Sequence, residues 1–541
     1  MNASLAAALP RGNALARRFG VGFGALAVLL GYFLLDIGWR DSVKATLVYT
    51  LGLYPLCRLA GPLSQRIGYR FWAALFAADM AIKGFLIAVF QTKPDTVLVI
   101  DAISNTTTEE CAEFAAQYSG LVLQYALSGL ALFAVLFMLR PDGERLERQR
   151  ARWAVGLLVI FVGLHANPTF RRANPALFWP NQIMQYQRFQ AKIEQLDEKR
   201  ALATRQLPQW APTYVGPAQN TVALIIGEST NRWNWQLYGY PRATTPQLMR
   251  EAKDAIVFRD VISGASGTVA SFRLMLTPAE IDKPVDDEAE PSVVMLAKAA
   301  GYKTFWISNQ HDRYINPRFA AEADVVKLVN VGGARGDRKL DEGVLPAWNE
   351  ALHDPAPLKL IVVHLLGAHP HYEMRSPPEY KHFSHMDDAI IEKMKRDERS
   401  PWVRLQRNNY DNAMLYQDAV IASLLHGFKA DVGAQHGAFL YTSDHAQEVG
   451  HTRNFAGHAM TEAGVAVPLF VWLSPQLDAG TDAELERRPF QTDALDWTVL
   501  DLAHIHTRFD APQEALLGPQ FVAQARFVGD QLYQPSKGPH D

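Results

Sequence analysis

The chain has 541 residues, which is too long for one compact core and predicts more than one domain. Its 53 basic and 56 acidic residues give a formal net charge of −3, which argues against nucleic acid as the main partner. The two cysteines, Cys57 and Cys111, are too few for a disulfide framework or a zinc-thiolate site, so any metal ion must be bound by oxygen and nitrogen ligands.

The first third of the chain holds most of the apolar residues, in five segments that precede residue 170. A helix that crosses the hydrocarbon core of a membrane needs about 20 residues. We predict a bundle of five transmembrane helices, over residues 21–35, 45–61, 71–90, 120–139 and 153–166. For the last and shortest segment, WAVGLLVIFVGLHA, a buried or interfacial helix is the alternative.

Arginines are concentrated in those connections between apolar segments that would lie on one side of the membrane. They precede the first segment and crowd the connections from the second to the third and from the fourth to the fifth. The loop at 91–118 is acidic instead. Because positively charged loops stay in the cytoplasm, the N-terminus is predicted to lie inside. Five crossings then place every residue after 167 on the outer side of the membrane.

Two charged residues, Asp79 and Lys83, lie in the middle of the third apolar segment. Their spacing of four positions puts them on the same face of a helix. Charges at this depth are expected to pair and to face the interior of the bundle. We interpret them as a structural ion pair rather than as part of a transport pathway.

Residues 168–218 are predicted to connect the membrane part to a large outer domain. The stretch NPTFRRANPALFWPNQIMQYQRF mixes aromatic residues, prolines and arginines, as membrane-interface segments do. A polar, helix-prone stretch and the proline-rich LPQWAPTYVGPAQN follow it. The predicted domains are a transmembrane domain at 1–167, interfacial and linker helices at 168–218, and the outer domain at 219–541.

From residue 219 onward, short apolar runs alternate with helical stretches. The apolar runs predict buried strands over residues 221–228, 303–308, 358–366, 437–445 and 465–474. Such alternation predicts an α/β domain with a largely parallel central sheet flanked by helices. Ligands gather at the carboxyl ends of strands in folds of this kind, which is where Glu228, His364 and the Asp444–His445 pair fall.

The strand ends offer a set of metal ligands. Glu228 closes the run ALIIGE, and Asp444 and His445 close FLYTSDH. Carboxylate oxygens and an imidazole suit Zn²⁺, or Mn²⁺ with less preference for nitrogen. Taken alone, a glutamate at a strand end is usually a solvated terminus or a helix cap, whereas an adjacent Asp-His pair on a buried strand is harder to explain in that way.

A hydroxyl nucleophile is available in VISGASGTVASFRLMLT, where Thr268 is predicted to be the N-cap of a helix. The N-terminus of a helix favours an anionic phosphoryl group, and a neighbouring metal ion would activate the hydroxyl. A plain capping threonine is the alternative, and Ser266 and Ser271 are rival hydroxyls. His369 and His458 lie in polar turns, where they could bind an anionic oxygen or protonate a leaving group.

Several longer stretches carry a family resemblance. They include GESTNRWNWQLYGYPRATTPQL (227–248), SGTVASF (266–272), HLLGAHP (364–370), TSDHAQEVG (442–450) and AGHAMTEAGVAVPLFVWLS (456–474). With them, the chain resembles the phosphoethanolamine transferases of the bacterial inner membrane, which belong to the alkaline phosphatase and sulfatase superfamily. The resemblance implies a multi-pass inner-membrane protein whose sulfatase-like catalytic domain, at 219–541, lies in the periplasm.

The resemblance also implies a reaction in two steps. Thr268 would attack the phosphorus of phosphatidylethanolamine, a membrane lipid, and release diacylglycerol. The phospho-threonine would then pass phosphoethanolamine to lipopolysaccharide or to a periplasmic glucan. By position, Glu228, Asp444 and His445 would hold a catalytic zinc ion beside Thr268, which is itself counted among the metal ligands.

Four further positions match functional residues of the family. His369 and His458 match histidines that contact the phosphate or a second metal ion. Asn105 and Glu109 match residues of the membrane loop that help to form the donor pocket. All four are therefore expected to contact substrate.

Departures from the family pattern leave alternatives open. Members that modify lipid A carry disulfides in the outer domain, and residues 219–541 contain no cysteine. The motifs GESTNR and SNQ are closer in sequence to those of members that modify lipopolysaccharide core sugars or periplasmic glucans. A lipid A-specific enzyme is therefore only an alternative. A glycerol-phosphate transferase of the lipoteichoic-acid-synthase type is another. A sulfatase would need a Cys/Ser-x-Pro-x-Arg motif, which does not surround Thr268, and a non-enzymatic sensor would not need the complete ligand set.

Overall fold

The computed structural model describes residues 10–35, 37–59, 62–90, 93–95, 97–106, 108–139, 148–283, 289–330, 340–384, 387–433, 435–477 and 484–535. The chain forms two compact units. The helical unit comprises residues 1–100 and 118–188, and the sheet unit comprises residues 101–117 and 189–541. The short segment 101–117 therefore belongs with the C-terminal part of the chain, although it lies between two helices of the N-terminal part.

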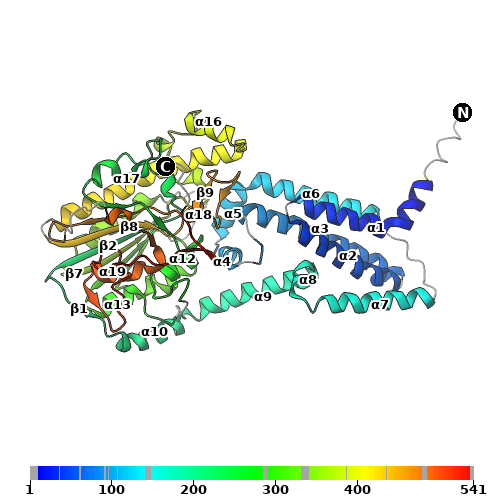
Figure 1. Cartoon of the computed structure of the whole chain (residues 1–541), viewed down its shortest axis with the longest axis horizontal. Coiled ribbons are helices and arrows are strands. Elements are labelled where there is room, and N and C mark those ends of the chain that lie inside the picture. The colour runs from blue at the N-terminus through cyan, green and yellow to red at the C-terminus, as the bar shows by residue number, and fades with distance from the viewer. Residues whose placement is uncertain are drawn as a thin grey trace. The chain divides into compact units, whose positions relative to one another are not determined.

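The helical unit is built around long helices with apolar sequences (Figure 1). Its elements are α1 (Pro10–Leu34), α2 (Trp39–Leu59), α3 (Pro62–Phe90), α6 (Ser119–Met138), α7 (Arg148–Leu164) and α8 (Pro168–Ala173). Helices α4 (Val97–Asn105) and α9 (Pro175–Glu194) each contain residues of both units, whereas α5 (Thr108–Gln117) belongs to the sheet unit. Aromatic side chains from α1, α2 and α3 form the centre of the core of the helical unit, including Tyr32, Tyr49 and Phe76.

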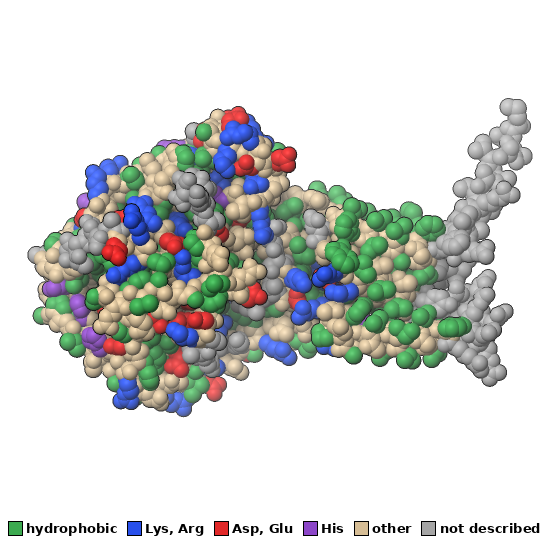
Figure 2. Space-filling model, viewed as in Figure 1, with side chains coloured by type: hydrophobic (Ala, Val, Ile, Leu, Met, Phe, Trp, Pro, Cys, Tyr) green, Lys and Arg blue, Asp and Glu red, His purple; other side chains and the backbone are tan. Residues whose placement is uncertain are grey.

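Two helical segments in the described part of the chain, Ile67–Phe90 and Ser119–Met138, are long and apolar enough to cross a membrane. Val21–Leu34 and Trp153–Leu164 are shorter apolar helices. Large apolar side chains on the outside of these helices are exposed, and Figure 2 shows them covering much of this unit. Apolar side chains on the outside of a helix bundle fit a lipid environment. Five crossings stay a prediction.

The predicted ion pair inside the third apolar segment is confirmed. Lys83 Nζ lies 2.9 Å from Asp79 Oδ1, and both side chains are buried. Tyr32 Oη and Trp179 Nε1 also donate hydrogen bonds to the Asp79 carboxylate, at 2.6 and 2.9 Å. A buried carboxylate with these partners holds helices together, as the structural interpretation predicts.

The sheet unit contains a seven-stranded sheet in the order β3-β11-β8-β2-β7-β5-β6. These strands are β2 (Asn220–Gly227), β3 (Ile256–Phe258), β5 (Lys303–Ser308), β6 (Val325–Leu328), β7 (Leu358–His364), β8 (His436–Ser443) and β11 (Leu469–Leu473). Strands β8, β2, β7, β5 and β6 pair in parallel. Strand β11 is antiparallel to both β3 and β8, so the sheet is mixed.

The prediction of a largely parallel sheet is therefore confirmed in part: five neighbouring strands are parallel, but the strand predicted over 465–474 is antiparallel, which makes the sheet mixed. The first residue of β11, Leu469, pairs with Thr442 near the end of β8. Between the two strands, the chain thus stays at the end of the sheet where β8 ends, and it makes no crossover to the opposite end. A strand that starts beside the end of its neighbour must run antiparallel to it. An apolar run predicts burial but carries no information on direction.

Helices cover both faces of this sheet (Figure 1). One face of β2 packs under α12 (Thr268–Met275), α13 (Val293–Ala299) and α19 (Leu495–Leu502). The other face packs under α15 (Leu345–Leu352) and the long α17 (Pro401–Val432). Burial of β2 on both sides explains why its sequence, NTVALIIG, is almost continuously apolar.

The remaining elements are α10 (Leu196–Trp210), which has 15 residues, and a set of short helices and strands. The short helices are α11 (Leu248–Glu251), α14 (Ile315–Arg318), α16 (Ala389–Arg396) and α18 (Glu462–Val465). The strands are β1 (Thr213–Tyr214), β4 (Val261–Ile262), β9 (Glu448–Val449), β10 (Ala456–Gly457), β12 (Phe490–Gln491), β13 (Ile505–His506), β14 (Phe527–Val528) and β15 (Gln531–Leu532).

Candidate metal centre

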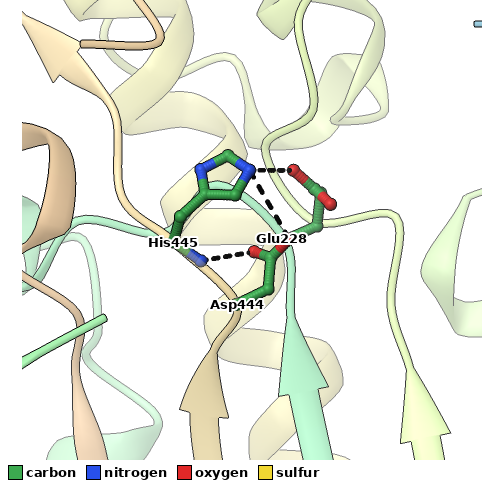
Figure 3. A group of neighbouring side chains, drawn as sticks. All are labelled: Glu228, Asp444 and His445. Carbon is green, nitrogen blue, oxygen red and sulfur yellow. Dashed lines mark hydrogen bonds and ion pairs between the residues drawn. The ribbon is translucent and has the colours of Figure 1, made fainter. Parts of the chain in front are cut away.

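The candidate centre lies at the carboxyl ends of two neighbouring parallel strands. Gly227, the last residue of β2, is in register with Ser443, the last residue of β8. The next residues, Glu228 and Asp444, therefore leave the sheet side by side, and His445 follows directly. Figure 3 shows the three side chains turned toward one another above the strand ends. All three are fully buried.

The distances within this group fit a tetrahedral metal ion. His445 Nε2 lies 3.3 Å from Glu228 Oε1 and 3.5 Å from Asp444 Oδ2. The hydroxyl of Thr268 lies 3.1 Å from Glu228 Oε2 and 3.5 Å from His445 Nε2. Ligands about 2.1 Å from a tetrahedral zinc ion lie about 3.4 Å from each other. In Glu228, Asp444 and His445, the atoms that could bind a metal ion all lie within 4.8 Å of one another.

Electrostatics support the same conclusion. Burial and the neighbouring Glu228 charge raise the pKa of Asp444 well above its usual range. Burial lowers the pKa of His445, but the Asp444 and Glu228 charges outweigh burial and raise it to about 9. Two buried carboxylates this close need a positive charge between them. A divalent cation supplies that charge and would displace the imidazole proton, so metal binding should release a proton.

Hydrogen bonds to the other atoms of the ligands fix their orientation. His445 Nδ1 donates to the Ala446 carbonyl at 2.9 Å, which leaves Nε2 facing the carboxylates as the nitrogen that would bind the metal ion once its proton is displaced. The Ser229 hydroxyl donates to Glu228 Oε1 at 2.6 Å, and the Ser229 N–H donates to Asp444 Oδ1 at 3.1 Å. Asp444 Oδ2 is buried and accepts no hydrogen bond in the described part of the chain, so its lone pairs remain for a cation.

Thr268 is the first residue of α12, and Gly267 is its N-cap, so the prediction of Thr268 as the N-cap is wrong by one residue. The hydroxyl donates to Glu228 Oε2 instead of capping backbone N–H groups. The rival hydroxyls of Ser266 and Ser271 are buried, and that of Ser271 bonds to the Ala265 carbonyl. Thr268 is the partly exposed member of the three and the one in contact with the metal group.

Two of the predicted histidines lie beside this group. The rings of His458 and His445 are 4.8 Å apart between centroids, and His458 Nδ1 donates to the Ser266 carbonyl at 3.1 Å. Burial and the His445 charge lower the pKa of His458 to about 3, so its imidazole is neutral. Burial raises the pKa of Glu228, but the His445 charge outweighs burial and lowers it well below its usual range. His369 lies close enough for its charge to lower the pKa of Glu228 further.

His364 lies at the end of β7 but is not one of the grouped ligands. It is fully buried, and its ring packs on Phe272 of α12 with 4.4 Å between centroids. Burial lowers the pKa of His364 to about 4. It therefore acts as a neutral core side chain beneath the helix that begins with Thr268.

The side chains of Asn105 and Glu109 lie outside the described residues. Two neighbours in the same segment contact the loop that carries His369. Glu113 forms an ion pair with Arg375, whose Nε donates to the His369 carbonyl at 3.0 Å. Gln117 Oε1 accepts a hydrogen bond from the His371 N–H at 2.6 Å. The segment 101–117 is thus bonded to a loop at the metal centre.

Supporting residues were missed by sequence reasoning because their partners are far away in the chain. Asp341 accepts hydrogen bonds from the Leu366 and Gly367 N–H groups, at 2.7 and 2.9 Å, and so holds the loop beside Glu228. Gln310 Nε2 lies 3.5 Å from Glu228 Oε2. For Gln310 alone the sequence offered an indication of a functional role, because this residue belongs to the SNQ motif.

Gly367→Ala is expected to weaken metal binding through the backbone of Glu228. Gly367 has a φ of +57°, and a Cβ there would collide with Glu228 O and lie 2.7 Å from Glu228 N. Gly239→Ala is the matched control, because Gly239 has a φ of +92° but its Cβ would meet no atom within 4 Å. Both variants should lose about 1 kcal/mol of stability from left-handed backbone. Titration of the metal-free protein with Zn²⁺ should show weaker binding in Gly367→Ala alone; equal affinities would contradict the packing argument.

The sequence comparisons extend over nearly the whole chain. The sulfatase family model matches residues 220–505, which is more than half of the chain. Phosphoethanolamine transferase EptC of Escherichia coli (strain K12) is 29% identical over 528 residues, covering 91% of this chain and 89% of EptC. Phosphoethanolamine transferase CptA of Salmonella typhimurium is 29% identical over 541 residues, covering 94% of this chain and 91% of CptA.

Solved structures agree with these matches. The crystal structure of the C-terminal periplasmic domain of E. coli EptC in complex with Zn matches with a TM-score of 0.56 and 31% identity, over 61% of this chain and 97% of that domain. The integral membrane protein EptA of Neisseria meningitidis has the same fold, with a TM-score of 0.64 and 18% identity over 93% of this chain and 98% of EptA. On these matches, the chain belongs to the sulfatase family and, within that family, to the phosphoethanolamine transferases.

Proposed function

We propose that this chain moves phosphoethanolamine from phosphatidylethanolamine, through a phosphorylated Thr268, to lipopolysaccharide or a periplasmic glucan. The observation that carries the proposal is the contact of the Thr268 hydroxyl with Glu228 Oε2, at 3.1 Å, within the metal-ligand group. A hydroxyl in such a position is activated as a nucleophile. The names of the relatives EptC and CptA agree with this activity.

Glu228, Asp444 and His445 would hold the metal ion, with the Thr268 oxygen as a further ligand. The zinc complex of the EptC domain favours zinc over manganese. When bound, zinc supplies positive charge that offsets the negative charge developing on the phosphoryl oxygens. The ligand spacing supports this assignment, and so does the buried Asp444 Oδ2, which accepts no hydrogen bond from the residues that the structure describes.

The chain's own residues define the course of the reaction. Thr268 Oγ1 forms a bond to the phosphorus of the donor, and the phosphorus–oxygen bond to diacylglycerol breaks. The hydroxyl proton leaves along the existing hydrogen bond to Glu228 Oε2 and is passed on to the departing oxygen, so that neutral diacylglycerol is released. Because Thr268 is the first residue of α12, the transferred group remains at the positive end of that helix. The oxygen of an acceptor hydroxyl then attacks the phosphorus, the bond between phosphorus and Thr268 Oγ1 breaks, and Thr268 takes up the proton that the acceptor hydroxyl loses.

His369 and His458 remain the proposed substrate-binding histidines. His458 is neutral, its Nδ1–H is used by the Ser266 carbonyl, and its Nε2 lone pair accepts a long hydrogen bond, 3.4 Å, from Gln447 Nε2 that a cation could replace. A lone pair suits a cation better than an anionic oxygen, which favours the second-metal role for His458. His369 is partly exposed, which leaves its side chain accessible to the phosphate. Asn105 and Glu109 stay proposed members of the donor pocket.

The proposed location is the bacterial inner membrane, with several crossings and the sheet unit in the periplasm. Two helices of suitable length and composition support membrane insertion, and the EptC domain that this chain matches is described as periplasmic. A membrane anchor keeps the catalytic residues close to a lipid donor.

Purified full-length protein should release diacylglycerol from vesicles that contain phosphatidylethanolamine. Vesicles that contain phosphatidylglycerol instead are the control, because a glycerol-phosphate transferase would use that lipid. Diacylglycerol from the phosphatidylglycerol vesicles alone would overturn the proposed donor. Mass spectrometry of lipopolysaccharide and periplasmic glucans from cells with and without the gene should then identify which acceptor gains phosphoethanolamine.

A further inference from the structure

A second candidate binding site lies within the helical unit. It is a cavity of about 360 Å³ formed where the end of α1, the start of α2, the end of α3 and helix α8 meet. Its charged lining consists of Lys44, Lys83, Lys93, Arg172, Asp41 and Asp95. The rest of the lining is mainly apolar, and it includes the ring of Phe178. A cavity with a cationic mouth and apolar walls matches an amphipathic anion.

The charges of this cavity do not balance. Lys44 pairs with Asp41 and Arg172 pairs with Asp95, each at 2.9 Å. Lys83 pairs with Asp79, which does not line the cavity, also at 2.9 Å. Among the residues that the structure describes, no ion pair is found for Lys93, which is exposed. One positive charge is therefore left over, and it equals in size the single negative charge of a phosphodiester.

The ion pairs of the acidic residues at the cavity also indicate which phospholipid headgroup fits, one with an ammonium group or one without. The ammonium group of phosphatidylethanolamine would need an acidic partner in the cavity. Asp41, Asp79 and Asp95 are already paired with basic side chains. A phosphodiester headgroup that carries no ammonium, such as that of phosphatidylglycerol, would leave these pairs intact and neutralise Lys93. The charge pattern therefore favours an anionic phospholipid over the proposed donor lipid.

The side chains around the cavity are of the kinds that contact the headgroup and the acyl chains of a membrane lipid. Figure 2 shows Lys and Arg side chains at one end of the hydrophobic surface of the helical unit. On the helices that line the cavity, Val43, Leu47 and Ile82 are exposed apolar side chains within two turns of the basic residues. Trp39 is exposed at the start of α2, and tryptophan is common at the level of the headgroups. Acyl chains would thus have an apolar surface to lie on.

We propose that this cavity binds the headgroup of an anionic phospholipid, at a site separate from the metal centre where phosphatidylethanolamine would react. The bound lipid would tie together the α1–α2 connection, the end of α3 and α8. This site lies outside the residues assigned to catalysis, so its occupancy does not depend on whether the proposed reaction is correct.

The test uses the full-length Thr268→Ala protein, so that no donor lipid is consumed during the experiment. The protein is reconstituted in nanodiscs of phosphatidylcholine with small equal amounts of phosphatidylglycerol and phosphatidylethanolamine. Lipids retained by the released protein are then identified by native mass spectrometry. Retention of phosphatidylglycerol in preference to phosphatidylethanolamine is expected. Preference for phosphatidylethanolamine would identify a donor site and overturn the proposal, as would displacement of the lipid by inorganic phosphate.

Lys93→Gln tests the location of the site. Removing one charge near the headgroup should lower phosphatidylglycerol retention roughly fivefold, since each such lysine contributes about 1 kcal/mol. Arg40→Gln is the matched control, because Arg40 is exposed on the first turn of α2 and does not line the cavity. Lys93 is exposed, so both variants should fold, which thermal unfolding will verify. Equal retention by Lys93→Gln and Arg40→Gln would overturn the assignment.

Discussion

Thr268→Ala is expected to abolish the release of diacylglycerol from phosphatidylethanolamine and to leave the bound metal in place. The variant removes the hydroxyl that lies 3.1 Å from Glu228 Oε2 but keeps the Glu228, Asp444 and His445 side chains. Loss of a covalent nucleophile should lower turnover by roughly 10⁴-fold or more. Diacylglycerol release from vesicles measures turnover, and elemental analysis of the purified protein measures zinc.

Two further variants make this result specific. Thr268→Ser keeps a hydroxyl and should retain part of the activity. Ser271→Ala removes a hydroxyl from the same helix, but that hydroxyl is buried and bonds to the Ala265 carbonyl. Ser271→Ala should therefore turn over nearly as fast as the unaltered protein. Normal turnover by Thr268→Ala, or loss of activity only in Ser271→Ala, would show that the nucleophile has been assigned wrongly.

Glu228→Gln is expected to lose both metal and activity. The substitution keeps the shape of the side chain but removes a negative charge that lies 3.3 Å from His445 Nε2. Changes to groups that only orient metal ligands typically cost 10- to 100-fold in affinity, so loss of a ligand should cost at least roughly 100-fold. Competition with a zinc-sensitive dye gives the affinity, and added Zn²⁺ should restore only a small part of the activity.

Glu448→Gln is the control for this change. Glu448 is a buried glutamate in the same TSDHAQEVG stretch, but its carboxylate accepts hydrogen bonds from Thr452 and lies outside the metal group. Glu448→Gln should keep its zinc even where it lowers stability. If Glu228→Gln bound zinc as tightly as the unaltered protein, Glu228 would have to be removed from the ligand set.

The strand ends at the metal centre were predictable because their signals are local. An apolar run that stops at Glu228 or at Asp444 indicates both a buried strand and a polar residue at its end. The pairing of β2 with β8 then brings the two carboxylates together. Direction is not local, however, and β11 runs antiparallel although its sequence resembles the parallel strands. The one-residue error at Thr268 has a similar cause, because its hydroxyl contacts Glu228, 40 positions away, instead of the backbone of its own helix.

The residues that hold the metal ligands in place were not predictable from local patterns. Asp341 and Gly367 fix the loop beside Glu228 through contacts with chain segments far from them in sequence. Ser229 bridges Glu228 and Asp444 with a φ of +60°, a conformation that nothing in the adjacent sequence indicates. The segment 101–117 was expected to belong to the membrane part, and its contacts with the His371 and Arg375 loop appear only in three dimensions.

Anomalous diffraction at the zinc absorption edge, from crystals of the full-length protein grown with Zn²⁺, is the most direct test of the metal centre. The expected result is a strong peak bounded by Glu228, Asp444 and His445, about 2.0–2.2 Å from each ligand atom, with Thr268 Oγ1 as its neighbour. A peak at any other place, with none among these four side chains, would contradict the account.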